Sequence, residues 1–115
     1  MSKNNVEKTK YGYDLIWAET EWYHAKIMVF ESAGNKSPIT FHKGINKSWF
    51  VNTGNFKVTW IDTTDGKLYE KEISEGVVFH ITAHTPVGIE ALTDNASISQ
   101  VSNSSDKTDA CYLSA

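Results

Sequence analysis

Side chains that could do chemistry gather in two stretches of the sequence, residues 38–54 and 76–91. The first stretch carries His42 and Lys47, and the second carries His80. Histidine can exchange a proton or ligate a metal near neutral pH, and a lysine ammonium pairs with carboxylate or phosphate groups. These residue types predict a site for a small polar or anionic ligand, with His42 as the catalytic base if a proton is moved.

Each of these residues also has a purely structural interpretation. Lys47 either binds an anion or is a solvated lysine at a strand end, and His42 is either a cavity base or a polar residue satisfied by a neighbour. Trp49 and Trp60 either form aromatic platforms for a ligand or fill a small barrel. Alternation places His80 on one face of its strand with Val78, but the pattern leaves open which face is internal.

Nine short segments of β-favouring residues follow one another along the chain, and no segment has a helical period. Such strands, at spacings of about 8–12 residues, are typical of an all-β sandwich or barrel. Asp65-Gly66 predicts a hairpin, and Gly54 predicts a tight turn. The predicted strands are residues 11–17, 22–30, 39–42, 47–51, 56–62, 68–73, 77–82, 87–92 and 96–101.

The alternation also predicts which residues share a face. Phe56, Val58 and Trp60 are expected to point inward. His24 shares one face of its strand with Lys26 and is expected to be exposed, as is His84 in a turn.

Length and composition exclude several classes of protein. The 115 residues suit one domain, with residues 1–10 as a flexible segment, 11–102 as the barrel and 103–115 as a tail or strap. The net charge of -3 and the lack of a basic cluster argue against a nucleic-acid partner. No membrane span or secretory signal is predicted. Cys111 is the single cysteine, which suits a reducing compartment, and we expect a cytoplasmic protein.

Two motifs give the sequence a resemblance to a known family. FHKGINKSWFVNTG, residues 41–54, and VFHITAHTPVGIEALTD, residues 78–94, resemble the paired motifs of cupins. The more specific likeness is to the cupin domain of type II mannose-6-phosphate isomerases, and it covers roughly residues 11–102. It implies a double-stranded β-helix, or jelly-roll barrel, in a single domain. It also implies a homodimer, for which the early aromatic residues Trp22 and Tyr23 are candidate interface residues.

The departures from the cupin motifs concern the metal ligands. Cupins hold a metal with three histidines and one glutamate, and the corresponding positions here are His42, Gly44, Lys47 and Val87. Glycine and valine have no side-chain donor, and a lysine ammonium repels a cation. We therefore expect no metal at the usual site and no other cofactor. A rebuilt site that joins His42 to His80 or His84 is the alternative.

Three functions follow from these observations. The first is a cupin that binds a small polar or anionic ligand without a metal, through Lys47, Trp49, Trp60 and His80. The second is an enzyme: a sugar-type isomerase or epimerase with His42 as base, or a metal-dependent cupin with the rebuilt histidine site. The third is a scaffold whose interior is filled by aromatic side chains, namely Trp49, Phe56 and Trp60.

Overall fold

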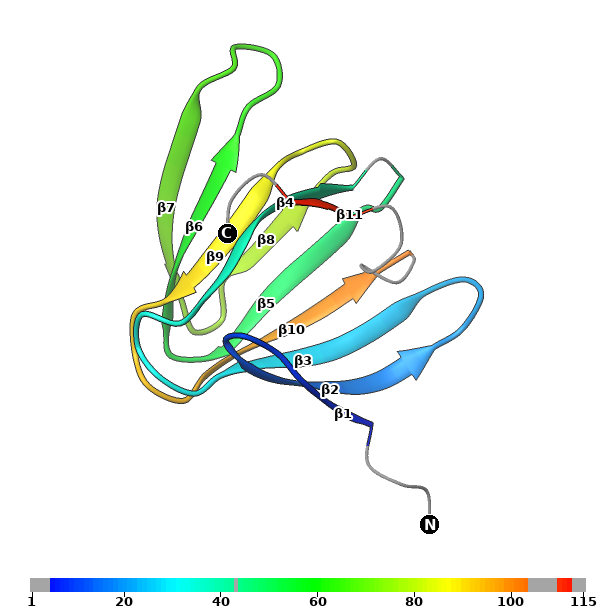
Figure 1. The fold of residues 1–115 in the computed structure, drawn as a ribbon, viewed down its shortest axis with the longest axis vertical. Helices are drawn as coiled ribbons and strands as arrows, with labels where there is room; N and C mark the ends of the chain where they lie inside the picture. Colours follow the sequence, from blue (N-terminus) through cyan, green and yellow to red (C-terminus); the bar gives the residue numbers. More distant parts are fainter. Residues whose placement is uncertain (1–4, 43, 104–109, 113–115) are drawn as a thin grey trace.

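The protein is a two-sheet β-barrel, seen in a computed structural model that describes residues 5–42, 44–103 and 110–112. One sheet has six strands in the order β1-β2-β3-β10-β5-β8, and the other has five in the order β11-β4-β9-β6-β7 (Figure 1). All the pairings between strands are antiparallel. The strands are β1 (Val6–Lys8), β2 (Gly12–Glu19), β3 (His24–Phe30), β4 (Lys36–His42), β5 (Lys47–Thr53), β6 (Asn55–Ile61), β7 (Leu68–Ser74), β8 (Val78–Ile81), β9 (Val87–Ala91), β10 (Ala96–Ser102) and β11 (Ala110–Tyr112).

The all-β class predicted from the sequence is confirmed, and each of the nine predicted strands is present. Two short strands were not predicted. β1 lies in the polar segment 1–10 and pairs with β2, and β11 pairs with β4 at the opposite sheet's edge. Both contain three residues, too few to show a period of two in the sequence. The rest of the predicted tail or strap, 104–109 and 113–115, lies outside the described residues.

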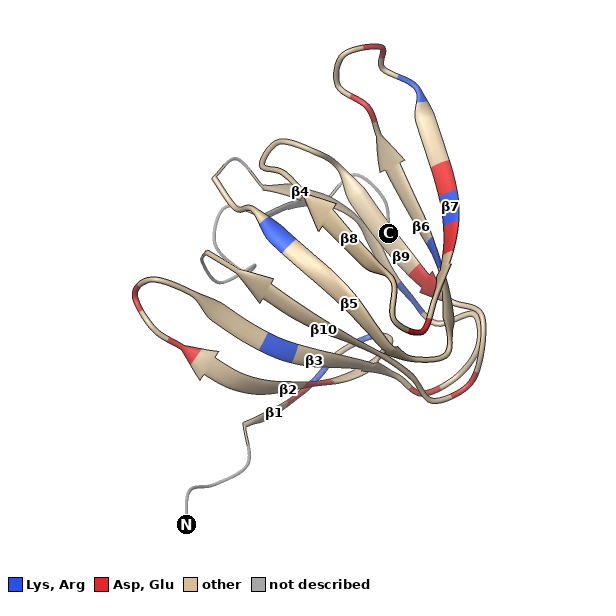
Figure 2. Cartoon of the chain, turned by 180° about the vertical axis from the view of Figure 1, so that it is seen from behind, with Lys and Arg blue, Asp and Glu red and all other residues tan. Residues whose placement is uncertain are grey.

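The core lies between the two sheets, where alternate residues of each strand face inward. The inward positions predicted for β6 are confirmed, because Phe56 and Val58 are fully buried and Trp60 packs against the core. Phe56 meets Phe30 edge to face, with ring centroids 5.1 Å apart. By contrast, the edge strand β7 carries Glu70, Lys71 and Glu72 in succession, which Figure 2 shows as alternating charge. Charged edges of this kind discourage pairing with other sheets.

The prediction that His24 is exposed is wrong, because both it and Lys26 are only partly exposed. In β3 they share the inner face with the buried residues Met28 and Phe30. Lys26 is tolerated there because its ammonium lies 2.9 Å from the carboxylate of Asp14, which is itself buried. A buried charge needs such a partner, and the sequence spacing does not reveal the pair.

Glycines set two of the turns. Gly54 has a φ of +83°, and a Cβ atom built there would lie 2.5 Å from the hydroxyl of Thr93 and 2.7 Å from the Cβ of Ala96. Gly66 has a φ of +71° in the predicted hairpin, where its N–H donates to the carbonyl of Asp62. Only glycine adopts such backbone angles without a steric cost.

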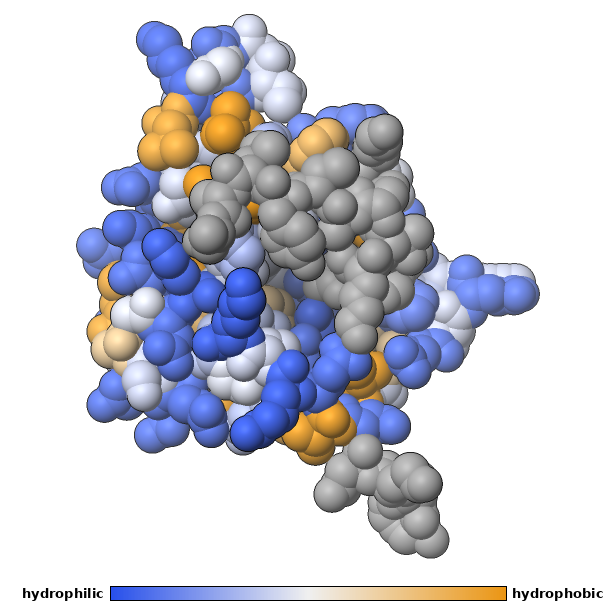
Figure 3. Space-filling view, viewed as in Figure 1, coloured by the Kyte–Doolittle hydropathy of each residue, from blue (hydrophilic) through white to orange (hydrophobic). Residues whose placement is uncertain are grey.

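The described surface in Figure 3 is largely hydrophilic, with apolar areas near the β6–β7 hairpin at the top and near the lower edge. Exposed apolar side chains of this kind are ordinary when they are scattered. Among the described residues there is no helix of the length and apolar character that a membrane span requires.

Candidate functional site

The inner face of the six-stranded sheet changes from apolar to polar along the barrel. Where β3, β10 and β5 lie side by side, one row consists of the apolar residues Met28, Ile98 and Val51. The next row holds Lys26, Gln100 and Trp49, and the last holds His24, Ser102 and Lys47. One end of the interior is therefore apolar core and the other is lined by groups that can hydrogen-bond.

The five-stranded sheet adds two polar residues to the same end. His42 and Thr40 both lie on the inner face of β4 and are buried. We call Thr40, His42, Lys47, Gln100 and Ser102 the polar end of the barrel. All five have exposed fractions of 9% or less, in an interior that is otherwise built mainly of apolar side chains. Buried polar groups are costly unless they are hydrogen-bonded, so a group of five at one end marks a candidate site.

Trp49 contacts two members of the polar end, Lys47 and Gln100. Lys47 and Trp49 lie two residues apart on β5, so both side chains point inward, and the ammonium of Lys47 lies 5.4 Å from the centroid of the Trp49 ring. That distance is within the range of a cation–π interaction. The indole N–H of Trp49 also donates to the side-chain oxygen of Gln100, at 2.7 Å. Trp49 therefore holds two polar neighbours in fixed positions.

His42 ends β4 at the same end of the barrel. Its carbonyl accepts a hydrogen bond of 2.7 Å from the N–H of His84, which fixes the β8–β9 turn against β4. The prediction that His84 is exposed in a turn is confirmed, and its φ of +70° belongs to that turn. The structure thus brings His42 and Lys47 to one end of the interior.

His80 lies on the other side of the sheet. It is paired with Ser48, and the serine hydroxyl and the imidazole Nδ1 are 2.7 Å apart on the outer, exposed face. The alternation that the sequence left open is therefore resolved: Phe79 and Ile81 face inward, and Val78 and His80 face outward. The structure does not bring the His80 imidazole to the polar end.

Trp60 lines a separate cleft, about 400 Å³ in volume, between the end of β6 and strand β8. We call it the β6–β8 cleft. Phe79 contacts both tryptophans, since its ring lies 5.3 Å from that of Trp60 and 6.4 Å from that of Trp49. The residues that line the cleft are Trp60, Ile61, Asp62, Thr63, Thr64, Phe79, His80, Ile81, Thr82 and Thr85.

Sequence reasoning missed two members of the polar end and the buried polar group beside it. Gln100 and Ser102 alternate with Ala96 and Ile98 in β10, so the period of two could have placed them inward. Lys26 gave no such signal, because its burial depends on Asp14, twelve residues earlier. Tyr11 also donates a hydrogen bond to Asp14 and stacks on Phe30, with centroids 4.2 Å apart.

Solved structures with this arrangement of strands are known. The capsular polysaccharide assembling protein CapF from Staphylococcus aureus matches all of the chain with a TM-score of 0.83 at 16% sequence identity. Oxalate decarboxylase from Bacillus subtilis matches 96% of it with a TM-score of 0.82 at 18% identity. Both neighbours are cupins. The chain has a cupin-type jelly-roll fold.

The likeness establishes the cupin fold and no more. The chain spans 35% of the CapF chain and 30% of the oxalate decarboxylase chain, so both neighbours are much longer proteins. No family model matches the sequence, and no curated protein is similar to it. The cupin resemblance drawn from the motifs is confirmed at the level of the fold. The finer likeness to type II mannose-6-phosphate isomerases stays a prediction.

Cupin enzymes hold metal ions, and one of the oxalate decarboxylase structures concerns Mn(II) centres. The residues at the four positions that the motif resemblance assigns to metal ligands do not fit a divalent cation. His42 offers a ring nitrogen, whereas Lys47 brings a positive charge into the interior and Val87 is a buried apolar residue. In the part of the chain that the structure describes, no three His, Cys, Asp or Glu side chains are grouped to share a metal ion.

Proposed function

We propose that this protein is a small cupin-fold binding protein that takes a small polar or anionic ligand at the polar end of its barrel, without the usual cupin metal. The observation that carries the proposal is the burial of Lys47 beside Trp49 and Gln100, at the position where cupins place a carboxylate ligand. The substitution exchanges a cation-binding group for an anion-binding one.

The polar end has the chemistry that such a ligand requires. An anion would gain a charge-assisted hydrogen bond from Lys47, which is stronger in a buried site than in water. Ser102 lies directly opposite Lys47 across β10 and β5 and supplies a hydroxyl. His42, on the facing sheet, can donate or accept a hydrogen bond according to its protonation.

The experiment is a titration of isotope-labelled protein with inorganic phosphate and with malonate, followed by NMR. We expect saturable shifts at Lys47, Trp49 and Ser102 for at least one anion. Lys47→Gln should weaken that binding about tenfold or more, a change of roughly 1.4 kcal/mol. Lys57→Gln is the matched control, because Lys57 is a half-buried lysine on β6 that lies 3.8 Å from Glu90 and 3.9 Å from Glu70. An equal loss of anion affinity in the two variants would refute the proposal.

A sugar isomerase or epimerase with His42 as base is the second candidate. It is favoured by the burial of His42 on the inner face of β4 and by the sequence likeness to type II mannose-6-phosphate isomerases. Such chemistry also needs an acid or an oxyanion donor, for which Lys47 is the nearest candidate in sequence. Turnover of mannose 6-phosphate that His42→Gln abolishes would favour this candidate over simple binding.

We further propose that a second copy of the chain covers the outer face of the six-stranded sheet. Phe50 and Val78 lie opposite each other on β5 and β8 and are 45% and 49% exposed. Val101, on the neighbouring strand β10, is 46% exposed. Trp22 and Tyr23, in the turn between β2 and β3, are also exposed. Paired apolar residues on one face favour an interface.

We propose the cytoplasm as the compartment of this protein, which is consistent with its single cysteine, Cys111.

A further inference from the structure

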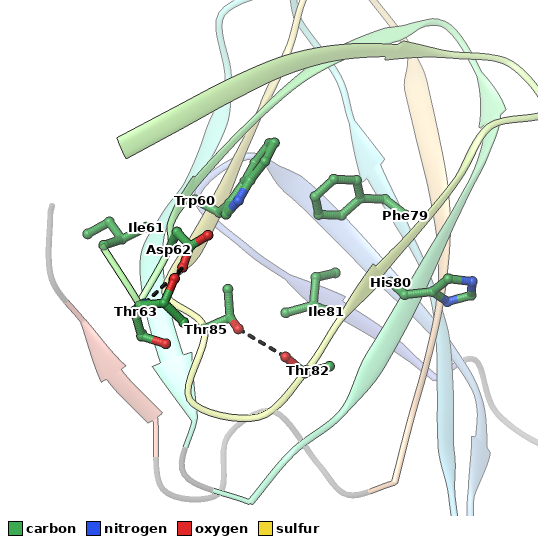
Figure 4. Close-up of a pocket in the computed structure, with 10 residues that line it drawn as sticks. Trp60, Ile61, Asp62, Thr63, Phe79, His80, Ile81, Thr82 and Thr85 are labelled. Atoms are coloured by element: carbon green, nitrogen blue, oxygen red, sulfur yellow. Dashed lines mark hydrogen bonds between the residues drawn. The ribbon is translucent and has the colours of Figure 1, made fainter. Parts of the chain in front are cut away.

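The β6–β8 cleft is shaped by aromatic and aliphatic side chains. Figure 4 shows Trp60, Phe79 and Ile81 turned toward a common space, while His80 points away from it. The indole of Trp60 contacts two rings, because Tyr69 meets it edge to face at 5.8 Å and Phe79 lies 5.3 Å away. The volume of about 400 Å³ is that of a small-molecule site.

The charge of the cleft is negative. Asp62 is the only ionisable carboxylate among its ten lining residues, and none of them is lysine or arginine. The Oδ1 atom of Asp62 accepts hydrogen bonds from the hydroxyl and the N–H of Thr64, at 2.6 and 2.8 Å. These bonds hold the pKa of Asp62 below its ordinary value of 3.8, so its carboxylate is charged at neutral pH.

Hydroxyl groups complete the rim of the cleft. The Oγ1 atoms of Thr82 and Thr85 lie 3.1 Å apart and close the side formed by the β8–β9 turn, as the dashed line in Figure 4 shows. Aromatic faces beside a fixed negative charge attract a cation in two ways, by cation–π interaction and by direct charge pairing. The same charge disfavours an anion.

We propose that the β6–β8 cleft is a binding site for a small organic cation, an ammonium group with an apolar body, that packs on Trp60 and Phe79 and pairs with Asp62. The polar end of the barrel carries Lys47 and is opposite in charge, so this second site does not depend on the ligand proposed there. Tryptophan is the strongest of the aromatic side chains for a cation, and a methylated ammonium would also bury its carbon surface against Phe79 and Ile81.

The test compares choline with its neutral isostere, in which a tert-butyl group replaces the trimethylammonium group. Both are titrated by NMR into the isotope-labelled full chain. We expect choline to shift the signals of Trp60, Phe79 and Thr85 and to bind at least about fivefold more tightly than the isostere, as a cation–π term of roughly 1 kcal/mol requires.

Two variants identify the groups that carry the effect. Asp62→Asn keeps an oxygen for Thr64 and removes the charge, and it should weaken choline binding about fivefold or more. Trp60→Phe should weaken it as well, since phenylalanine binds cations less strongly. The matched control is Asp94→Asn, because Asp94 also accepts a backbone N–H bond of 2.8 Å, from Ala33, but does not line the cleft.

The proposal is overturned by any of four results. These are equal affinity for choline and its isostere, unchanged affinity in Asp62→Asn, choline shifts that map away from the cleft, and tighter binding of a neutral sugar such as glucose at the same residues. Loss of anion binding in Lys47→Gln with choline binding intact would separate this site from the one proposed at the polar end.

Discussion

The indole N–H of Trp49 donates a 2.7 Å hydrogen bond to the side-chain oxygen of Gln100, and both residues are buried. The bond lies where the apolar core meets the polar end, and it joins β5 to β10 through side chains as well as backbone. It has a measurable consequence. Gln100→Leu leaves the indole N–H of Trp49 without this acceptor, and we expect a loss of about 1–3 kcal/mol in the free energy of unfolding.

The double variant provides the control for that loss. Adding Trp49→Phe to Gln100→Leu removes the stranded N–H, so the combined loss should be smaller than the sum of the two single losses. Urea unfolding followed by circular dichroism measures all three variants. Strictly additive losses would show that the Trp49–Gln100 bond has no stabilising effect.

A second prediction concerns the turn between β5 and β6. Gly54→Ala should destabilise the protein by more than Gly66→Ala, although both glycines have positive φ angles. The backbone strain is shared, at about 1 kcal/mol, but only the Gly54 Cβ would clash with Thr93 and Ala96. The difference in melting temperature between the two variants measures the destabilisation that comes from the clash at position 54. Equal melting temperatures would mean that Thr93 can move aside freely.

The outer face of the six-stranded sheet provides a test of the proposed homodimer. Phe50→Asp should produce a monomer, because a carboxylate at an apolar interface loses its hydration without gaining a partner. Leu68→Asp is the control, since Leu68 is at least as exposed as Phe50 but lies on β7 of the other sheet. Light scattering after size-exclusion chromatography gives the mass. A wild-type protein that is already monomeric at high concentration would refute the homodimer.

A further prediction concerns the pKa of Tyr69 in the β6–β7 hairpin. The phenol of Tyr69 donates to the carboxylate of Asp65 at 2.5 Å, and this bond raises the pKa of Tyr69 above its ordinary value of 10.0. Since the bond favours the protonated phenol, its contribution to stability is present below that ordinary value and is lost as the pH rises through the raised one. Asp65→Asn should return the pKa toward 10.0 in a tyrosinate absorbance titration, whereas Glu70→Gln should leave it raised.

The residues at the positions that resemble cupin metal ligands lead to a prediction about bound metal. Because Gly44, Lys47 and Val87 cannot ligate a cation, elemental analysis of untagged protein, purified without added metal, should find no stoichiometric transition metal. One metal ion per chain would contradict the metal-free binding function. Replacing His42 would then show whether that metal is held at the polar end.

The fold could be predicted from the sequence because it depends on local patterns. The alternation of Phe56, Val58 and Trp60 placed β6 correctly, and Asp65-Gly66 identified its hairpin. The polar end was predicted only in part, since Lys47 and His42 belong to recognisable motifs. Gln100 belongs to no such motif, although the alternation of β10 could have placed it inward. Lys26 gave no signal, because its burial depends on Asp14, twelve residues earlier in the sequence.

The change from apolar to polar residues along the barrel has an evolutionary consequence. Phe30, Phe56 and Ile98 are fully buried in the apolar part of the interior, whereas His42 and Lys47, which the motif resemblance places at ligand positions, belong to the polar end. Substitutions such as those at Gly44 and Lys47 can therefore alter the ligand that the barrel accepts while the residues that drive folding stay unchanged. In a barrel of this kind, the ligand that is bound can change by successive substitutions while every intermediate variant still folds.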